Sequence, residues 1–173
     1  MGNKLNLLYI KTDYMAGKIA IVGAGASGKD YLRKRFMDRD FTYGVSCTTR
    51  PPRPSEVHGE DYYFLTDEEF DAGIESESFV EWQSFKDWRY GLMKPEFEKC
   101  DVMILNAEAV NLLDKEYRDR LFVIYLAIPE ETRRHRLNVR DDKDDTIERR
   151  IKVDEEQFGN FSNFDCIITN ENF

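Results

Sequence analysis

The feature that most constrains this chain is a glycine-rich loop between a short apolar run and a helical pattern. Its residues are Gly23, Ala24, Gly25, Ala26, Ser27, Gly28, Lys29 and Asp30. The apolar run at 18–22 predicts a buried strand, and residues 28–37 predict a helix. With the spacing G-x-x-x-x-G-K, backbone N–H groups and the helix N-terminus converge on one point. The loop therefore predicts a phosphate-binding site in which Lys29 reaches the β- and γ-phosphates; an ordinary glycine-rich turn is the alternative.

The rest of the chain alternates between apolar runs and helical patterns. Three further runs predict buried strands at 101–105, 121–126 and 165–168. Helical patterns separate or follow them at about 107–118, about 129–138 and about 146–158. Such alternation is typical of a parallel sheet covered by helices on both faces. We therefore expect an α/β fold with a P-loop NTPase core.

One segment, 42–93, breaks this alternation. It is rich in aromatic residues and proline, with strand-like pieces at 62–64 and 79–82 and a helical pattern from Thr66 to Gly73. We interpret it as an inserted small α+β subdomain that can close over a substrate. The P-loop core then consists of 17–41 and 94–173. Residues 1–16 are interpreted as a leader or tag-like segment.

Composition and charge exclude several functions. A net charge of −9 argues against binding to a nucleic acid backbone. No apolar run approaches the roughly 20 residues that a membrane helix needs. The cysteines, Cys47, Cys100 and Cys166, form no C-x-x-C pair, which favours reduced thiols and a cytoplasmic location over a zinc or disulfide framework. The expected partners are small-molecule nucleotides, and a homodimer is left open.

A second motif lies downstream of the loop. Arg50 and Arg53 are three residues apart on a segment stiffened by three prolines, and two guanidinium forks held in this way suit a dianionic phosphate. A solvated basic turn is the alternative. The pieces T-T-R-P-P-R at 48–53 and G-E-D-Y-Y-F at 59–64, with Phe79-Val80-Glu81-Trp82, resemble guanylate kinases in order and spacing. The resemblance runs from about residue 17 to residue 170.

The resemblance implies an acceptor site for GMP. The residues at the matching positions are Ser46, Arg50, Arg53, Tyr62, Glu81, Tyr90 and Glu108. It assigns the arginines and tyrosines to the phosphate of GMP, and Ser46, Glu81 and Glu108 to the base. A carboxylate offers two adjacent acceptors to the N1–H and N2–H₂ donors of guanine, whereas adenine presents an acceptor at N1. For Glu81, a surface strand carboxylate is the alternative.

The resemblance also implies a lid at about 138–146, which contains the acidic run 141–145. Its phosphate-contacting arginines match Arg136, Arg140 and Arg150, and Asn170 matches a position that approaches the adenine of ATP. Fixed cations stabilise the charge that spreads over a phosphoryl group in transfer. Lys29 and these three arginines are therefore the expected catalytic residues. We interpret the other arginines of this stretch, including Arg133, as solvated helix residues.

Three positions depart from the family pattern. Asp30 replaces the Ser or Thr that ligates Mg²⁺; its carboxylate either binds the metal directly or weakens nucleotide binding. Asn106 stands where the family has Asp, and Leu92 stands where it has a small hydroxyl residue, so one acceptor contact is expected to be absent. We hypothesise that Asp30 and Asn106 compensate each other in charge.

The sequence as a whole predicts an enzyme that transfers phosphate from ATP, with Mg²⁺, to GMP or dGMP in one in-line step. Another nucleoside monophosphate is an alternative acceptor. A non-catalytic guanylate kinase-like module for protein binding is the alternative of another class. Such modules typically lose the loop lysine and the lid arginines, whereas this chain has Lys29, Arg140 and Arg150.

Overall fold

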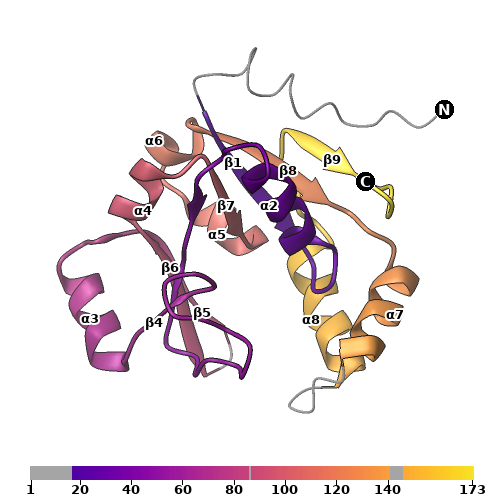
Figure 1. Cartoon of the computed structure of the whole chain (residues 1–173), viewed down its shortest axis with the longest axis horizontal. Helices are drawn as coiled ribbons and strands as arrows, with labels where there is room; N and C mark the ends of the chain where they lie inside the picture. Colours follow the sequence, from indigo (N-terminus) through magenta and orange to yellow (C-terminus); the bar gives the residue numbers. More distant parts are fainter. Residues whose placement is uncertain (1–16, 86, 141–145) are drawn as a thin grey trace.

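The computed structural model describes residues 17–85, 87–140 and 146–173, so the predicted leader and most of the predicted lid lie outside it. The helices and strands, labelled as in Figure 1, are β1 (Lys18–Gly23), α2 (Lys29–Met37), β2 (Tyr43–Gly44), β3 (Cys47–Thr48), β4 (Tyr63–Phe64), α3 (Asp67–Glu75), β5 (Phe79–Phe85), β6 (Trp88–Met93), α4 (Lys94–Lys99), β7 (Val102–Leu105), α5 (Ala107–Leu112), α6 (Lys115–Arg118), β8 (Leu121–Leu126), α7 (Glu130–Arg140), α8 (Ile147–Phe158) and β9 (Cys166–Ile168).

A five-stranded sheet forms the centre of the molecule, in the order β2-β7-β1-β8-β9, and its paired strands are all parallel. Alternate residues of β1 enter two different hydrophobic clusters. Ala20 and Val22 pack on one side of the sheet, and Ile19 and Ile21 pack on the other. Burial on both faces explains why these strands read as continuous apolar runs. The predicted α/β core is confirmed.

A second sheet, in the order β4-β3-β6-β5, is built from residues within 47–93. Helix α3 covers one of its faces, where Phe70 stacks on Phe79 with ring centroids 4.6 Å apart. Thr66 begins α3 with a capping box: its hydroxyl accepts from the Glu69 N–H at 3.1 Å, and the Glu69 carboxylate accepts from the Thr66 N–H at 2.8 Å. Strand β2 lies inside the predicted insertion but pairs with β7 of the larger sheet.

One predicted element is wrong. The helix expected over about 107–118 is two short helices, α5 and α6, because the chain turns at Leu113 (φ −58°, ψ 133°). The turn lets Leu113 bury its side chain in the main cluster, where Tyr117 packs with its ring centroid 5.2 Å from that of Phe97. Burial of these side chains outweighs the loss of a continuous helix.

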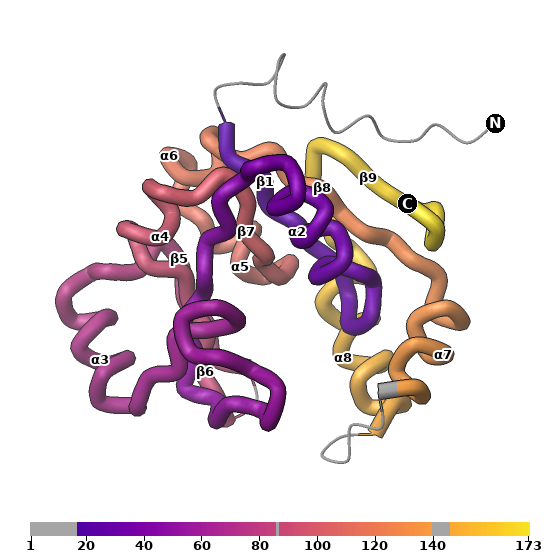
Figure 2. The backbone as a smooth tube through the Cα atoms, viewed as in Figure 1, coloured from indigo at the N-terminus to yellow at the C-terminus, as the bar shows by residue number. Residues whose placement is uncertain are grey.

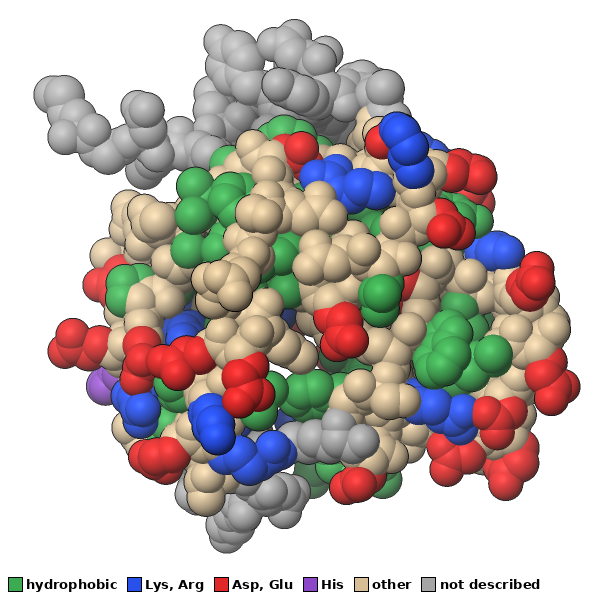
Figure 3. All heavy atoms as spheres, turned by 180° about the vertical axis from the view of Figure 1, so that it is seen from behind, with side chains coloured by type: hydrophobic (Ala, Val, Ile, Leu, Met, Phe, Trp, Pro, Cys, Tyr) green, Lys and Arg blue, Asp and Glu red, His purple; other side chains and the backbone are tan. Residues whose placement is uncertain are grey.

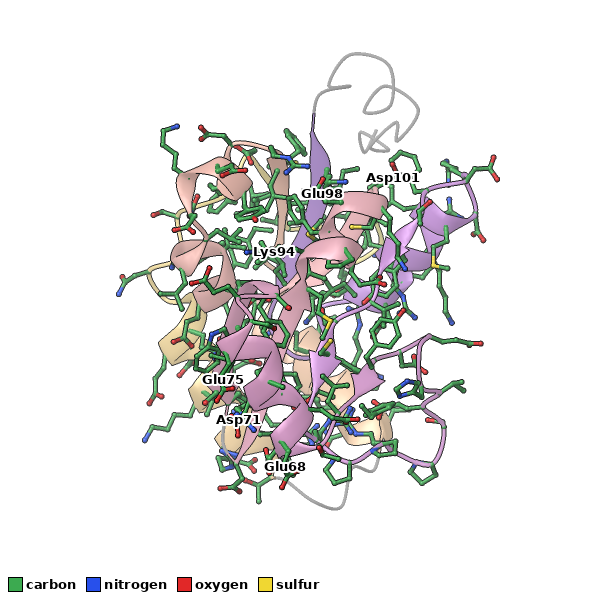
Figure 4. All side chains as sticks on the ribbon, turned by 90° about the vertical axis from the view of Figure 1, so that its left-hand side faces the viewer. Glu68, Asp71, Glu75, Lys94, Glu98 and Asp101 are labelled. Atoms are coloured by element: carbon green, nitrogen blue, oxygen red, sulfur yellow. The ribbon has the colours of Figure 1, made fainter. Side chains whose placement is uncertain are left out.

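Two groups of helices and strands lie at opposite ends of the molecule, on either side of the central sheet. Figure 2 shows α3 and the second sheet at one end, and α7 beside α8 at the other. The described part of the chain contains no helix long and apolar enough to cross a membrane. Acidic side chains are spread over the face shown in Figure 3, with basic side chains and hydrophobic patches among them. Figure 4 shows Glu68, Asp71 and Glu75 along the outer side of α3.

Candidate nucleotide-binding site

The glycine-rich loop joins β1 to α2 at the edge where the parallel strands end. Gly28 has φ +102°, which a side chain would strain. A Cβ on Gly23 would lie 2.6 Å from Oγ of Ser27 and 3.0 Å from the carbonyl oxygen of Leu126. Glycine is therefore required at both positions by the path of the backbone. The predicted strand–loop–helix context is confirmed.

The side chain of Lys29 folds back over this loop. Its ammonium group donates to the carbonyl oxygens of Gly23 at 2.7 Å and Ala24 at 3.0 Å. The N-cap residue of α2 is Gly28, which supplies no side-chain cap. The first turn of α2 thus presents backbone N–H groups and a partial positive charge next to a fixed ammonium group, an arrangement that suits phosphate oxygens.

Helix α7 places Arg136 against the same loop. Its Nη1 donates to the carbonyl oxygens of Ala26 at 3.1 Å and Ser27 at 3.3 Å, and its Nη2 donates to that of Glu171 at 3.1 Å. The structure therefore joins Arg136 to the loop. Arg150 lies on α8, and the side chain of Arg140 lies outside the described residues.

Sequence reasoning missed a link between the loop and helix α8. The Asp154 carboxylate accepts from the Gly25 N–H, with N···O distances of 3.1 and 3.2 Å, and pairs with Arg133 at 2.6 Å. Arg133 is only 7% exposed and also donates to the Ile128 carbonyl oxygen at 3.3 Å. The interpretation of Arg133 as a solvated residue is wrong. No local pattern marks Asp154, because its partners lie far away in the sequence.

The two arginines of the second motif share a carboxylate. Glu56 accepts from Nη2 of Arg50 with both oxygens at 2.8 Å. It also accepts from the backbone N–H of Arg53 at 2.8 Å and from Nη1 of Arg53 at 3.4 Å. The guanidinium carbon of Arg50 lies 5.6 Å from the ring centroid of Tyr62. Glu56 thus fixes the spacing of the two forks, a role that its position between prolines and glycine did not reveal.

A cleft of about 310 Å³ brings the two motifs together. It is lined by Lys29, Asp30, Arg33, Lys34, Tyr43, Ser46, Arg53, Glu56, Asp61, Tyr62 and Ile104. Residues from the loop, from the helix after it and from the second sheet therefore face one space. No group of three or more His, Cys, Asp or Glu side chains arranged for a metal occurs within the described ranges. Asp30 is exposed and lines the cleft beside two other carboxylates, Glu56 and Asp61.

Glu81 lies on β5 at a β-bulge, where the register shifts between Phe79 and Glu81, opposite Leu92 of β6. Burial raises the pKa of its carboxyl group to about 8, opposed by a hydrogen bond with the backbone of Leu92. Its Oε2 is buried without a hydrogen-bond partner among the described residues. Glu81 lines another cleft of about 310 Å³, beside Trp82 and Leu112. The first cleft is not lined by Glu81, and Glu108 is exposed and lines neither cleft.

The strand register places Tyr90 on the same face of the second sheet as Thr48 and Gln83. Tyr90 of β6 lies opposite Thr48 of β3 and Gln83 of β5, and its ring centroid is 6.1 Å from that of Tyr62. Directly opposite residues of an antiparallel pair share a face of the sheet. This face, which we call the inner face, is the side of the second sheet away from α3.

Three other predicted positions have structural roles. Leu92 is fully buried in the main cluster, so its side chain packs in the core and does not leave a gap beside the arginines. Asn106 caps α5, accepting from the Ala109 N–H at 2.7 Å. Asn170 is exposed after β9 and accepts from the Asn172 N–H at 3.0 Å.

Comparisons with known proteins identify one family. The family model described as guanylate kinase matches residues 15–173. Guanylate kinase of Onion yellows phytoplasma (strain OY-M) is 34% identical over 164 residues, covering 88% of this chain and 77% of the relative. Guanylate kinase of Polaromonas sp. (strain JS666) is 30% identical over 170 residues, covering 93% and 82%. The crystal structure of guanylate kinase from Anaplasma phagocytophilum shares the fold, with a TM-score of 0.66, 22% identity, and coverage of 90% and 78%.

Proposed function

Because the chain belongs to the guanylate kinase family, we propose that it transfers the γ-phosphoryl group of ATP to GMP or dGMP. The observation that carries this proposal is the cleft lined by Lys29 of the glycine-rich loop together with Arg53 and Tyr62 of the second motif. A donor phosphate on the loop and an acceptor phosphate on the arginines would face each other across this space. The products are ADP and GDP or dGDP.

The reaction needs no covalent nucleophile on the protein. An oxygen of the acceptor phosphate attacks the γ-phosphorus of ATP in line, while the bond to the β–γ bridging oxygen breaks and leaves ADP. In this scheme Lys29 leaves the carbonyl oxygens of Gly23 and Ala24 and binds the β- and γ-phosphates. Arg136, already at the loop, and Arg140 and Arg150 of the lid region would neutralise the moving group.

Without a bound nucleotide, the Glu56 carboxylate takes the place of a phosphate between the two arginines of the acceptor site. It binds both guanidinium forks, and a dianionic phosphate would compete for the same donors. The forks are thereby held near their working positions before substrate binds, which reduces the ordering that binding requires. Tyr62 and Tyr90 would donate their hydroxyl hydrogens to the same phosphate.

One carboxylate of the cleft suits a divalent metal. Asp30 offers a hard oxygen ligand of the type that Mg²⁺ takes together with water and phosphate oxygens, whereas Glu56 is already bound to Arg50 and Arg53. Asp30, next to Lys29 on α2, is the residue that would hold it. When bound with ATP, Mg²⁺ neutralises charge on the β- and γ-phosphate oxygens.

The enzyme acts on small nucleotides in the cytoplasm in this proposal. All three cysteines are free, as expected of a reducing compartment. The acidic outer side of α3 and the net charge of −9 disfavour nucleic acid as a partner.

The test is ADP release from ATP and Mg²⁺ with GMP, dGMP, AMP, CMP, UMP and dTMP in turn. We expect turnover with GMP and dGMP and little with the others. Lys29→Met should lower kcat by at least about a hundredfold, because a fixed transition-state cation is lost. Absence of turnover with every acceptor would refute the kinase. Preference for a pyrimidine would refute the role of Glu81.

A further inference from the structure

One buried side chain of the inner face has a polar atom without a hydrogen-bond partner among the described residues. Gln83 of β5 is 7% exposed, and no group among the described residues donates to its Oε1. An amide oxygen buried without a donor costs about 1–3 kcal/mol, so such atoms are uncommon in folded proteins. The position therefore suggests a donor supplied by a ligand.

Gln83 lies two residues from a second buried acceptor that has no hydrogen-bond partner among the described residues, Oε2 of Glu81. The two residues are two apart on β5, beyond the bulge, so their side chains emerge on the same face of the strand. Their Cα atoms are roughly 7 Å apart at the usual rise of a strand. Two acceptors on long side chains can converge on one planar group across this spacing.

The face concerned is the inner face, which carries Glu81 and Tyr90 of the proposed acceptor residues. Gln83 lies opposite Tyr90, whose ring is near that of Tyr62, and Tyr62 lines the cleft that contains Lys29. Trp82 lies between Glu81 and Gln83 on β5 and points to the other face of the sheet. There its ring centroid is 6.3 Å from that of Phe70 of α3.

We propose that Gln83 is a further base-reading residue, whose amide oxygen accepts a hydrogen bond from the 2-amino group of guanine. This inference rests on the proposed function. Guanine carries three hydrogens on this edge, one at N1 and two at N2. The two oxygens of Glu81 take the N1 hydrogen and one N2 hydrogen. Gln83 takes the remaining N2 hydrogen and so distinguishes guanine from a purine that lacks the amino group.

The test compares GMP with inosine monophosphate, which keeps N1–H but has no 2-amino group. In Gln83→Met the side chain keeps its length and loses its acceptor. We expect kcat/KM for GMP to fall about tenfold, the equivalent of one hydrogen bond. The value for inosine monophosphate should stay within about twofold, which also shows that the variant is folded.

Ser84→Ala is the matched control, because Ser84 is the exposed neighbour of Gln83 and faces the other way. It should leave both substrates unchanged. Equal losses for the two substrates in Gln83→Met would overturn the inference. If the wild-type protein turns over neither nucleotide, the proposed function fails. Calorimetric binding of the same two nucleotides to the wild type and to Gln83→Met then still decides the role of Gln83: a preference for GMP over inosine monophosphate that the substitution leaves unchanged would refute it.

Discussion

At the scale of single residues, the burial of Glu81 bears directly on its proposed role in base recognition. A carboxyl group with a pKa of about 8 is mostly protonated at neutral pH when the site is empty. In the proposed role, it must lose that proton to accept two hydrogen bonds from guanine. The charged form is then stabilised by the donors of the base, so nucleotide binding and proton release are coupled.

This coupling predicts a pH dependence of GMP binding. Below the raised pKa, the fraction of deprotonated Glu81 falls about tenfold per pH unit. The KM for GMP should therefore decrease about tenfold between pH 7 and pH 9 and level off above the pKa. Glu81→Gln, which does not titrate, is the control and should remove the dependence together with most of the affinity. A wild-type profile identical to that of Glu81→Gln would contradict the role of the buried carboxyl group.

Asp30 and Asn106 allow a test of charge compensation around the metal. Asp30→Ser should raise the Mg²⁺ concentration needed for half-maximal activity, because a carboxylate ligand is lost. Adding Asn106→Asp should restore part of the affinity. Asp caps helices as well as Asn does, so α5 should tolerate the second change. If the double variant is no better than Asp30→Ser, the two positions do not compensate.

At the scale of elements, Asp154 connects three segments that are far apart in the sequence. Its carboxylate joins the loop at Gly25, helix α7 at Arg133 and its own helix α8. The pair is well shielded, with side chains 9% and 14% exposed. Removing one member leaves a charge buried without its counter-ion, which is more damaging than the loss of a surface pair.

We therefore expect Asp154→Ala to lower the free energy of unfolding by about 3 kcal/mol. The control is Arg134→Ala on the same helix, because Arg134 pairs with Glu130 and Glu148 on the surface. Its loss should cost less than about 1 kcal/mol. Urea unfolding measures both. Equal effects would mean that the Arg133–Asp154 pair contributes no more than a surface pair.

At the scale of the whole molecule, one hydrophobic cluster joins the two sheets. Val80 and Leu92 of the second sheet pack with Ala20, Val22 and other residues of the central sheet. The base of the second sheet is thus part of the main core.

Leu92 tests this packing. Leu92→Ser restores the small hydroxyl of the family pattern but removes a fully buried side chain from the shared cluster. We expect a loss of about 3 kcal/mol in the free energy of unfolding and no gain in affinity for GMP. Leu112→Ala, at a position 61% exposed, should change stability by less than about 0.5 kcal/mol. A tighter KM for GMP in Leu92→Ser would show that this position serves the acceptor site after all.

Much of the architecture could be predicted because it depends on local patterns. The strands of the central sheet are short apolar runs, and α3 begins at a capping box that the sequence displays. The break at Leu113 could not be predicted, since helical periodicity continues across it. Among the arginines of α7, the sequence does not distinguish buried Arg133 from Arg134 at the surface.

The sequence by itself determined the glycine-rich loop, the parallel core around it and the resemblance in the acceptor motif. These follow from spacing along the chain, which fixes backbone conformation and alternating burial. Only the tertiary structure decided that Asp154 binds the loop, that Glu56 holds both arginines and that Leu92 belongs to the core. It also left the amide oxygen of Gln83, beside Glu81, buried without a donor in the part of the chain that the structure describes. Such contacts join residues on different elements, so their energies depend on packing that no local pattern encodes.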